Sequence, residues 1–385
     1  KINMDTPSAF NWDFDLHIPR YTGTALSEFW FNFILMNAIF LLVYFLRKYP
    51  YPRKISWAMV LIFCLYAFWD TDYFSFANNF YSGLENFRDP LYQYISIFSL
   101  KSYIIFRFWI WGIGLLLVYH TAKRYKLHEN TMCYIFTVFF MLTFSYARVS
   151  LGMALYFYGL SYLIIRDNTD ALKRMTIIII TFILAYTAHR SILLLILLSP
   201  LALLKLTKKK VILILCFLPL IVIAIKYTLS GIISGALLRE SNEFTQSAQG
   251  YAASKIEVAF NWKWQLITTL RYWSFYIALV CILWVFFFRK GAKIESAEMQ
   301  SLLTITLSIE IIAITILSIG GNKLLGLWVI GYRYLYMAGI PLCLLLTYVS
   351  QKKLLNNKAI NKILIVPLLY AELFIVGKIL TLQVF

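Results

Sequence analysis

Long apolar stretches separated by short polar connections dominate the pattern of this chain. About twelve stretches occur, each near the ~20 residues that an α-helix needs to cross a bilayer. The stretches cover residues 27–46, 55–69, 102–119, 131–147, 149–165, 175–188, 191–207, 211–228, 266–288, 301–319, 330–349 and 361–382. Because a bilayer offers no water to unpaired backbone groups, the pattern predicts an all-α polytopic membrane protein. We expect residues 1–385 to form a single transmembrane domain.

Basic residues gather in every second connection between these stretches. The clusters are Arg47, Lys48, Arg53 and Lys54; Lys123, Arg124 and Lys126; Arg166, Lys173 and Arg174; Lys205, Lys208, Lys209 and Lys210; Arg289, Lys290 and Lys293; and Lys352, Lys353, Lys358 and Lys362. By the positive-inside rule these connections are cytoplasmic. Both termini are then predicted outside, together with the two longest connections, 70–101 and 229–265.

Composition agrees with this picture. The chain is 61% hydrophobic and 14% charged, with a mean hydropathy of +0.72. Its net charge of +18 would suggest nucleic-acid binding in a soluble protein, but here topology explains most of it, and no nucleic-acid partner is expected. The five cysteines lie within apolar stretches at no metal or disulfide spacing, so we interpret them as core residues. The first 26 residues are polar, which predicts no cleavable signal peptide.

Single arginines stand apart from the basic clusters, near the predicted outer ends of the stretches. They are Arg88, Arg148, Arg190, Arg239, Arg271 and Arg333. A charge at membrane depth costs roughly 2.5–3.5 kcal/mol on insertion scales, so it usually has a partner or a function. Because the planar guanidinium suits bidentate binding of phosphate, the set indicates a site for a lipid diphosphate. Snorkelling of these side chains to the interface is the alternative.

Acidic and imidazole groups are candidates for acid–base chemistry. Asp70 and Asp72 form an Asp-x-Asp pair that could bind a divalent cation or supply a general base. His189 stands directly before an arginine at a junction of two stretches, where it could act as a base or donate to phosphate. Solvated loop carboxylates and a capping histidine are the structural alternatives. Glu310 and Glu372 lie inside stretches, where we expect pairing with arginine or hydroxyl groups.

The chain carries three blocks at its predicted outer face. They read DTDYFSFANNF (70–80) with RDPLYQYISIF (88–98), YARVSLGMALYFYGLSYLI (146–164) and AYTAHRSILLLILL (185–198). Their order and spacing, with the late Arg333, resemble the O-antigen and exopolysaccharide polymerases, the Wzy and EpsG-like membrane proteins. The sequence departs from that pattern at Phe76, where a second tyrosine is common, and before Asp72, where Phe-Trp-Asp replaces an Arg-and-Gly lead-in. This departure leaves the role of Asp70 open.

The resemblance implies a bacterial inner-membrane glycosyltransferase of the GT-C-related class, which joins undecaprenyl-diphosphate-linked repeat units at the periplasmic face. The expected catalytic residues are His189, Asp72, Arg148, Arg190 and Arg333. The expected substrate-binding residues are Arg88, Asp89, Tyr73, Tyr92, Asp70, Arg239, Arg271, Tyr332, Tyr334, Trp262 and Trp264, the two tryptophans for stacking on sugars or, alternatively, as part of the interfacial belt. No metal or cofactor is expected, because arginines can neutralise a diphosphate.

Two other functions fit the same pattern. A lipid-linked glycan flippase or transporter would suit a dozen spans and buried carboxylates, but it should show pseudo-symmetric halves, and the two halves of this chain are not similar. A related O-antigen ligase or lipid-phosphate-dependent glycosyltransferase would share the same site, and its product would distinguish it. The expected partners are the lipid-linked donor and acceptor, membrane lipid and a chain-length regulator protein.

Overall fold

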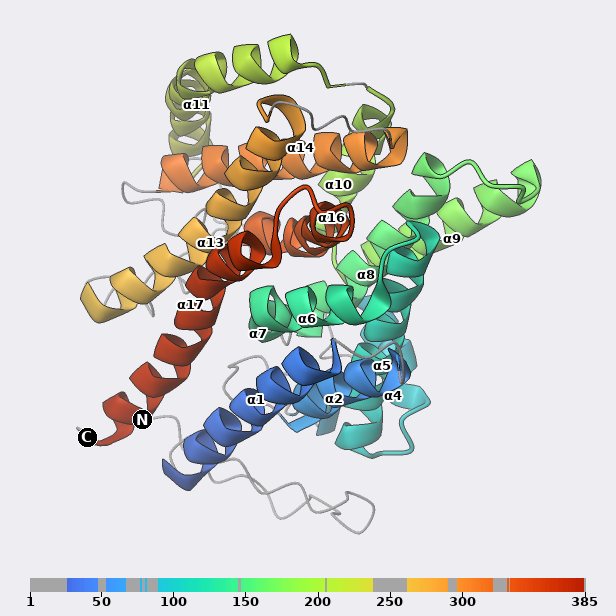
Figure 1. The fold of residues 1–385 in the computed structure, drawn as a ribbon, viewed down its shortest axis with the longest axis vertical. Helices are drawn as coiled ribbons and strands as arrows, with labels where there is room; N and C mark the ends of the chain where they lie inside the picture. The colour runs from blue at the N-terminus through green and yellow to red at the C-terminus, as the bar shows by residue number, and fades with distance from the viewer. Residues whose placement is uncertain are drawn as a thin grey trace.

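The computed structural model describes residues 26–47, 53–66, 77, 80–81, 89–144, 147–204, 206–237, 262–289, 296–320, 331 and 333–383. Every element in these ranges is helical, and no strand occurs among them (Figure 1). The all-α class predicted from the hydrophobic pattern is therefore confirmed. The relation to the GT-C class and the single-domain organisation stay predictions.

Most helices follow the apolar stretches in order along the chain, whereas the helix Pro90–Ile97 lies in the predicted outer connection 70–101. The first half contains α1 (Leu26–Leu46), α2 (Arg53–Tyr66), α4 (Pro90–Ile97), α5 (Tyr103–Arg124), α6 (Glu129–Phe139), α7 (Met141–Phe144), α8 (Ala147–Ile164) and α9 (Ala171–Ala188). The second half contains α10 (Ile192–Leu198), the 3₁₀ helix η3 (Ser199–Leu203), α11 (Lys208–Leu237), α13 (Trp262–Phe287), α14 (Ala297–Gly320), α16 (Gly339–Gln351) and α17 (Asn357–Gln383).

Six helices in the described ranges are long and apolar enough to cross a membrane. They are Tyr103–Arg124, Ala171–Ala188, Thr269–Phe287, Ala297–Leu317, Arg333–Gln351 and Asn357–Gly377. Shorter apolar helices accompany them at Trp30–Leu46, Lys54–Tyr66, Val149–Ile164 and Ile192–Leu203. These helices fit a polytopic membrane protein, and the larger count of about twelve spans stays a prediction.

The stretch expected to span the membrane over 191–207 is divided into two short helices. α10 ends at Leu198, and Pro200 stands in the first turn of η3, where its missing N–H breaks no helical hydrogen bond. Together the two helices reach about 20 Å, less than the ~30 Å hydrocarbon core. This segment packs against α8, α9 and α14.

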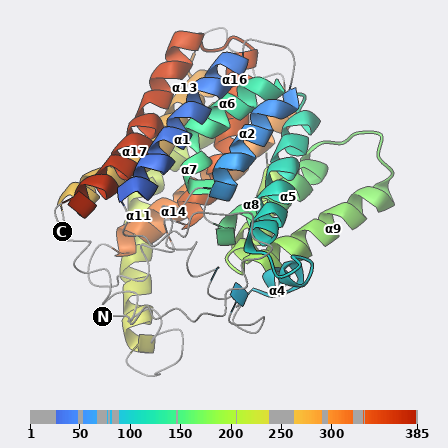
Figure 2. The same ribbon diagram turned by 90° about the horizontal axis from the view of Figure 1, so that it is seen from below.

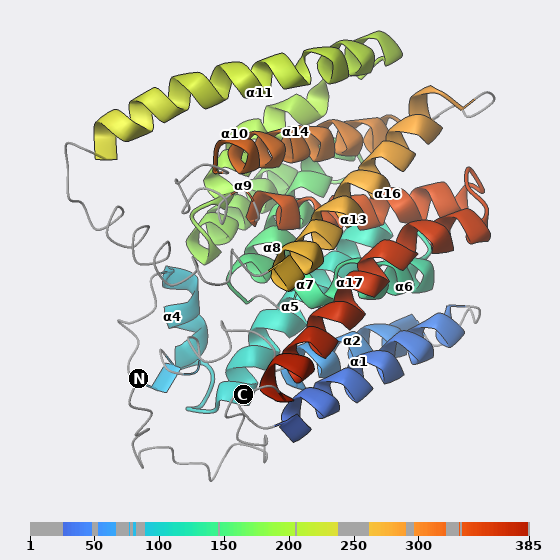
Figure 3. The ribbon, with the colours of Figure 1, turned by 90° about the vertical axis from the view of Figure 1, so that its left-hand side faces the viewer.

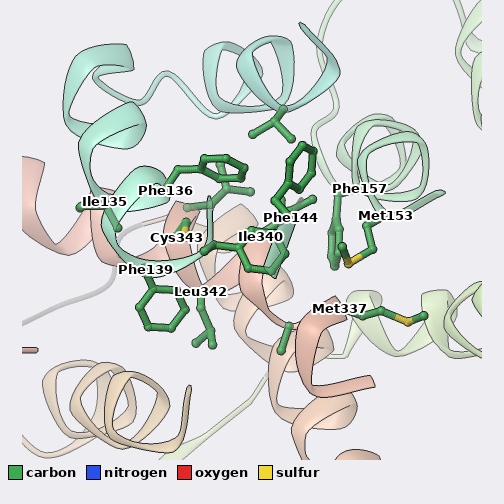
Figure 4. Close-up of a cluster of buried hydrophobic side chains, with 14 of the residues drawn as sticks. Ile135, Phe136, Phe139, Phe144, Met153, Phe157, Met337, Ile340, Leu342 and Cys343 are labelled. Atoms are coloured by element: carbon green, nitrogen blue, oxygen red, sulfur yellow. The ribbon is translucent and has the colours of Figure 1, made fainter. Parts of the chain in front are cut away.

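An aromatic core lies where α6, α7 and α16 meet. Phe136, Phe140 and Phe144 contact one another edge to face, with ring centroids 5.0 to 5.7 Å apart. Gly339 lets α16 approach these rings, because a Cβ at that position would overlap Phe140. Figure 4 shows Met153 of α8 beside the same cluster. The core thus joins helices from the middle and the end of the sequence.

Contacts between connections bring basic clusters to one end of the bundle. Arg124, at the end of α5, forms an ion pair of 3.0 Å with Asp167 in the α8–α9 connection. Gln351, at the end of α16, accepts from the His128 backbone N–H at 3.0 Å and donates to the Lys126 carbonyl oxygen at 3.2 Å. The α5–α6, α8–α9 and α16–α17 connections therefore lie together.

The remaining basic connections reach the same end. Arg47 Nη1, after α1, donates to Asn361 Oδ1 in the first turns of α17 at 3.4 Å. Lys208 Nζ, at the start of α11, lies 5.0 Å from the ring centroid of Phe288, which follows α13, and α13 packs against α16. We call this the basic end. Figure 3 shows the α16–α17 turn there, at the right, and α4 at the opposite end of the bundle, at the left.

Candidate active site

Two segments that are distant in the sequence meet at the end opposite to the basic end. α9 begins just after Asp167 and finishes at Ala188, so its last turn lies far from the basic end. The span Arg333–Gln351 runs the other way, which places Tyr334 at the same far end. The Tyr334 hydroxyl donates a hydrogen bond to the Ser191 carbonyl oxygen at 3.2 Å. Two groups of predicted site residues, 189–190 and 333–334, are thereby brought together.

A glycine on α8 brings a third segment to this place. A Cβ on Gly152 would lie 2.6 Å from Ile192 Cδ1, 3.3 Å from the Ala185 carbonyl oxygen and 3.5 Å from Ala188 Cβ. A glycine here lets α8 approach the α9–α10 turn closely. Arg148 lies one turn before Gly152 on α8, so its backbone stands beside the turn, although its side chain is outside the described part. We call residues 147–152, 188–192 and 333–334 the arginine junction.

The Phe144 carbonyl oxygen ties down the start of α8. It accepts a hydrogen bond from the Trp111 indole Nε1 of α5 at 3.2 Å and another from the Ser150 hydroxyl of α8. Both donor side chains are buried. Because buried polar groups are costly to leave unpaired, these two bonds restrict where α8 can begin and hence where the backbone of Arg148 lies.

His189 is buried in the arginine junction, with 6% of its surface exposed. Its Nδ1 accepts a hydrogen bond from the Ser191 backbone N–H at 3.2 Å, so the neutral ring carries its proton on Nε2. Its own backbone N–H donates to the Ala185 carbonyl oxygen at 3.0 Å, which ends α9. This is the geometry of the capping alternative. A chemical role for this ring would use Nε2–H as a hydrogen-bond donor.

Arg190 and Arg333 flank the hydrogen bond that joins the two segments. Arg190 directly precedes Ser191 and is exposed, while Arg333 directly precedes Tyr334 and is half-buried. Within the described part of the chain, neither guanidinium forms a hydrogen bond or an ion pair. Two cations in this state can accept an anionic ligand without first giving up a protein partner.

α4 packs on α5 and α9 and carries two more predicted site residues. Asp89 is the N-cap of α4 and is half-buried. Tyr92 is fully buried, with its ring centroid 6.5 Å from that of Phe106 in α5. A fully buried ring can shape this part of the site only through packing, and the substrate-binding roles expected for Tyr92 and Asp89 stay predictions.

Arg271 lies inside the bundle and is only 5% exposed, deeper than the interfacial position expected for it. Its guanidinium carbon lies 3.8 Å from the ring centroid of Tyr336 and 5.2 Å from that of Tyr370 in α17. Buried cation–π contacts of this kind stabilise packing. Arg271 thus joins α13 and α17 to the helix that carries Tyr334.

Several predicted site residues fall outside the described part of the chain. These are Asp70, Asp72, Tyr73, Arg88, Arg239 and Tyr332, together with the side chains of Arg148, Trp262 and Trp264. Their roles stay predictions.

Sequence reasoning missed Arg107, which is 2% exposed in the first turns of α5. Its Nε donates to the Leu65 carbonyl oxygen at 3.2 Å and its Nη2 to the Cys64 carbonyl oxygen at 2.5 Å. Its guanidinium carbon also lies 4.4 Å from the ring centroid of Trp111. Arg107 therefore caps the last turn of α2, where the helix dipole favours a cation. The position of Arg107, five residues inside the predicted span 102–119, was the feature of the sequence that could have indicated this role.

The two intramembrane glutamates are placed differently from expectation. Glu372 of α17 accepts a hydrogen bond from Asn37 Nδ2 of α1 at 3.3 Å, an amide donor in place of the expected arginine or hydroxyl. Glu310 of α14 is fully buried, and neither of its carboxyl oxygens has a hydrogen-bond partner in the described part of the chain. The expected pairing of Glu310 is therefore not observed there.

The six long apolar helices fit a polytopic integral membrane protein, and Arg190, Arg333 and the oriented His189 lie at one end of it. The family model described as "EpsG family" matches residues 55–381. The chain belongs to the EpsG family, which is of the exopolysaccharide and O-antigen polymerase type. The resemblance seen in the three sequence blocks is thus confirmed. No curated protein and no solved structure matches the chain.

Proposed function

We propose that this membrane protein polymerises oligosaccharide repeat units carried on undecaprenyl diphosphate, with its active site at the arginine junction. Family membership supports a glycosyltransferase-like polysaccharide polymerase in general. The observation that carries the finer proposal is the Tyr334–Ser191 hydrogen bond, because it places Arg190 and Arg333 on the two segments that meet there.

In the proposed reaction, a hydroxyl of the acceptor glycan attacks the anomeric carbon of the donor glycan. A C–O bond forms to the acceptor, the C–O bond to the lipid diphosphate breaks, and the hydroxyl proton passes to a base, for which Asp72 is the candidate. Arg148, Arg190 and Arg333 bind the diphosphate and stabilise the charge that grows on the leaving group. His189 Nε2–H donates to a phosphate or acceptor oxygen.

The neighbouring segments supply the rest of the proposed site. Asp70, Tyr73, Arg88 and Asp89 shape it from the first outer connection, and Arg239 from the second. Tyr332, Trp262 and Trp264 provide rings for stacking on sugars. Tyr334 acts by holding the two arginine segments together.

The proposed orientation places the basic end in the cytoplasm and the arginine junction at the periplasmic face of the inner membrane, with both termini periplasmic. The gathering of the basic connections at one end supports this orientation through the positive-inside rule. A lipid diphosphate on the periplasmic leaflet would then have its headgroup at the depth of Arg190.

The test is elongation of lipid-linked repeat units by the purified protein in detergent. We expect a ladder of products, and we expect Arg148→Ala, Arg190→Ala and Arg333→Ala each to lower its rate about 100-fold, as removal of one charge-stabilising donor does. Arg166→Ala is the matched control, because Arg166 is also an exposed arginine and lies at the opposite end of α9.

Three results would contradict the proposal. Undiminished ladders from all three variants would exclude these arginines from catalysis. Movement of lipid-linked glycan across vesicles without elongation would indicate a transporter. A single joining in place of a ladder would indicate a ligase.

A further inference from the structure

A pocket of about 240 Å³ opens at the basic end, far from the arginine junction. Four helices line it: the end of α1, the start of α6, the end of α16 and the start of α17. The lining residues are Arg47, Thr131, Tyr134, Ile135, Ser350, Asn357, Ile360 and Asn361. Most of them carry polar groups, and the lining contains no acidic residue.

Arg47 is held in this pocket by aromatic rings. Its guanidinium carbon lies 4.1 Å from the ring centroid of Tyr44 and 4.6 Å from that of Tyr134. Its Nη1 donates to Asn361 Oδ1 at 3.4 Å, and the Tyr134 hydroxyl donates to the same oxygen at 3.4 Å. No carboxylate pairs with Arg47 in the described part of the chain. The guanidinium is therefore oriented but not neutralised, as an anion site requires.

Exposed lysines and exposed apolar residues flank the lining residues of the pocket along the sequence. The lysines near the lining residues Ser350, Asn357 and Asn361 in the sequence are exposed; they are Lys352, Lys358 and Lys362. Along α17, Ile365 and Leu369 follow Asn361 at intervals of four residues, with exposed fractions of 48% and 47%. A free anion would not contact these apolar side chains, whereas the acyl chains of a lipid would cover them.

We propose that this pocket binds the phosphate headgroup of an anionic phospholipid, with Arg47 as its principal contact. The headgroup phosphate accepts hydrogen bonds from Arg47 and from the Asn361 side-chain amide. The acyl chains lie along Ile365 and Leu369 of α17. The bound lipid joins α1, α6, α16 and α17 at the basic end and stabilises the bundle.

The experiment measures thermal stability of the full-length protein in detergent during titration with phosphatidylglycerol, with phosphatidylcholine and with inorganic phosphate. We expect a rise in melting temperature with phosphatidylglycerol and little change with the other two. Arg47→Gln is expected to weaken phosphatidylglycerol binding about tenfold, since a hydrogen bond to a charged group is lost. Arg166→Gln, an exposed arginine at the same end but outside the pocket, should behave as wild type.

Native mass spectrometry of the same proteins counts the bound lipids and remains informative if Arg47→Gln lowers the starting melting temperature. Equal phosphatidylglycerol retention by wild type and Arg47→Gln would overturn the site. Equal stabilisation by phosphatidylcholine would overturn the choice of an anionic lipid, and equal stabilisation by inorganic phosphate would overturn the lipid itself.

Discussion

At the basic end, the Arg124 guanidinium is paired with Asp167 at 3.0 Å and lies 3.4 Å from the ring centroid of Tyr162. At the arginine junction, by contrast, the guanidinium groups of Arg190 and Arg333 form no hydrogen bond or ion pair within the described part of the chain. Both ends are cationic, but the partners differ. The Arg124 charge thus contributes to local structure, whereas the charges of Arg190 and Arg333 stay available to a ligand.

A third environment of an arginine side chain, neither ion-paired nor available, occurs near the junction end. Arg107 is buried and fully engaged with the carbonyl oxygens of Cys64 and Leu65. The three environments show that an isolated arginine in an apolar stretch is not by itself evidence of a binding site. Burial and partners decide whether it holds helices together or meets a substrate. Replacing Arg107, Arg190 and Asp167, the ion-pair partner of Arg124, separates these roles.

The largest effect on stability is expected for Arg107→Met. This change keeps the apolar stem but leaves two helix-end carbonyl groups without their donor, which should lower the free energy of unfolding by about 3 kcal/mol. Thermal melting in detergent measures the loss, and Arg166→Met is the exposed control. An unchanged melting temperature would show that Arg107 does not hold α2.

A smaller effect, on activity alone, is expected for Arg190→Lys. Lysine keeps the charge but loses the planar fork, so elongation of the lipid-linked glycan should slow about tenfold while thermal stability is preserved. Arg166→Lys, at the other end of α9, should change neither property. Equal rates for Arg190→Lys and wild type would mean that charge alone suffices at this position.

A loss of about 1 kcal/mol is expected for Tyr334→Phe, which removes the hydrogen bond to the Ser191 carbonyl oxygen. Because this bond joins the two arginine segments, elongation should slow as well. Tyr94→Phe is the control, since Tyr94 of α4 is 62% exposed. Melting temperature and elongation rate are measured on both variants, and a slowing shared by both would argue against a role for this hydrogen bond.

The smallest effect is expected for Asp167→Asn, at most about 0.5 kcal/mol, because surface ion pairs contribute little. The hydrogen bond from Thr169, and then the Arg124 charge, hold the pKa of Asp167 below its ordinary value. A lowered carboxyl pKa stabilises the fold above the unfolded-state pKa, and this contribution disappears as pH falls through the folded-state pKa. Melting curves of both proteins should therefore converge on acidification, and a difference that persisted would contradict this origin.

Much of the fold could be read from local patterns along the chain. The length of the apolar stretches predicted the helices. The clusters of lysine and arginine in every second connection predicted that these connections lie on one side, and the structure gathers them at one end. The division of 191–207 into α10 and η3 was not predicted, because hydropathy alone does not register the effect of Pro200 within a uniformly apolar run.

The candidate site was predictable in its residue types but not in its geometry. His189, Arg190 and Arg333 were singled out as chemically unusual, and the structure places their segments side by side. Sequence did not show that Tyr92 is fully buried or that Arg271 lies against Tyr336 and is 5% exposed. Burial depends on which helix faces which, and an apolar stretch gives little indication of its facing partner.

By itself, the sequence determined that the protein is a polytopic membrane protein with one strongly basic end, and its motifs indicated the family. These properties follow from the free energy of transfer of each residue between water and lipid, which depends mainly on the residue itself and its neighbours in the sequence. The tertiary structure alone decided which arginines are engaged and which are available. The Tyr334–Ser191 hydrogen bond crosses 143 positions of the chain. Such a contact arises from the packing of α8, α9 and the last spans, and no local pattern contains it.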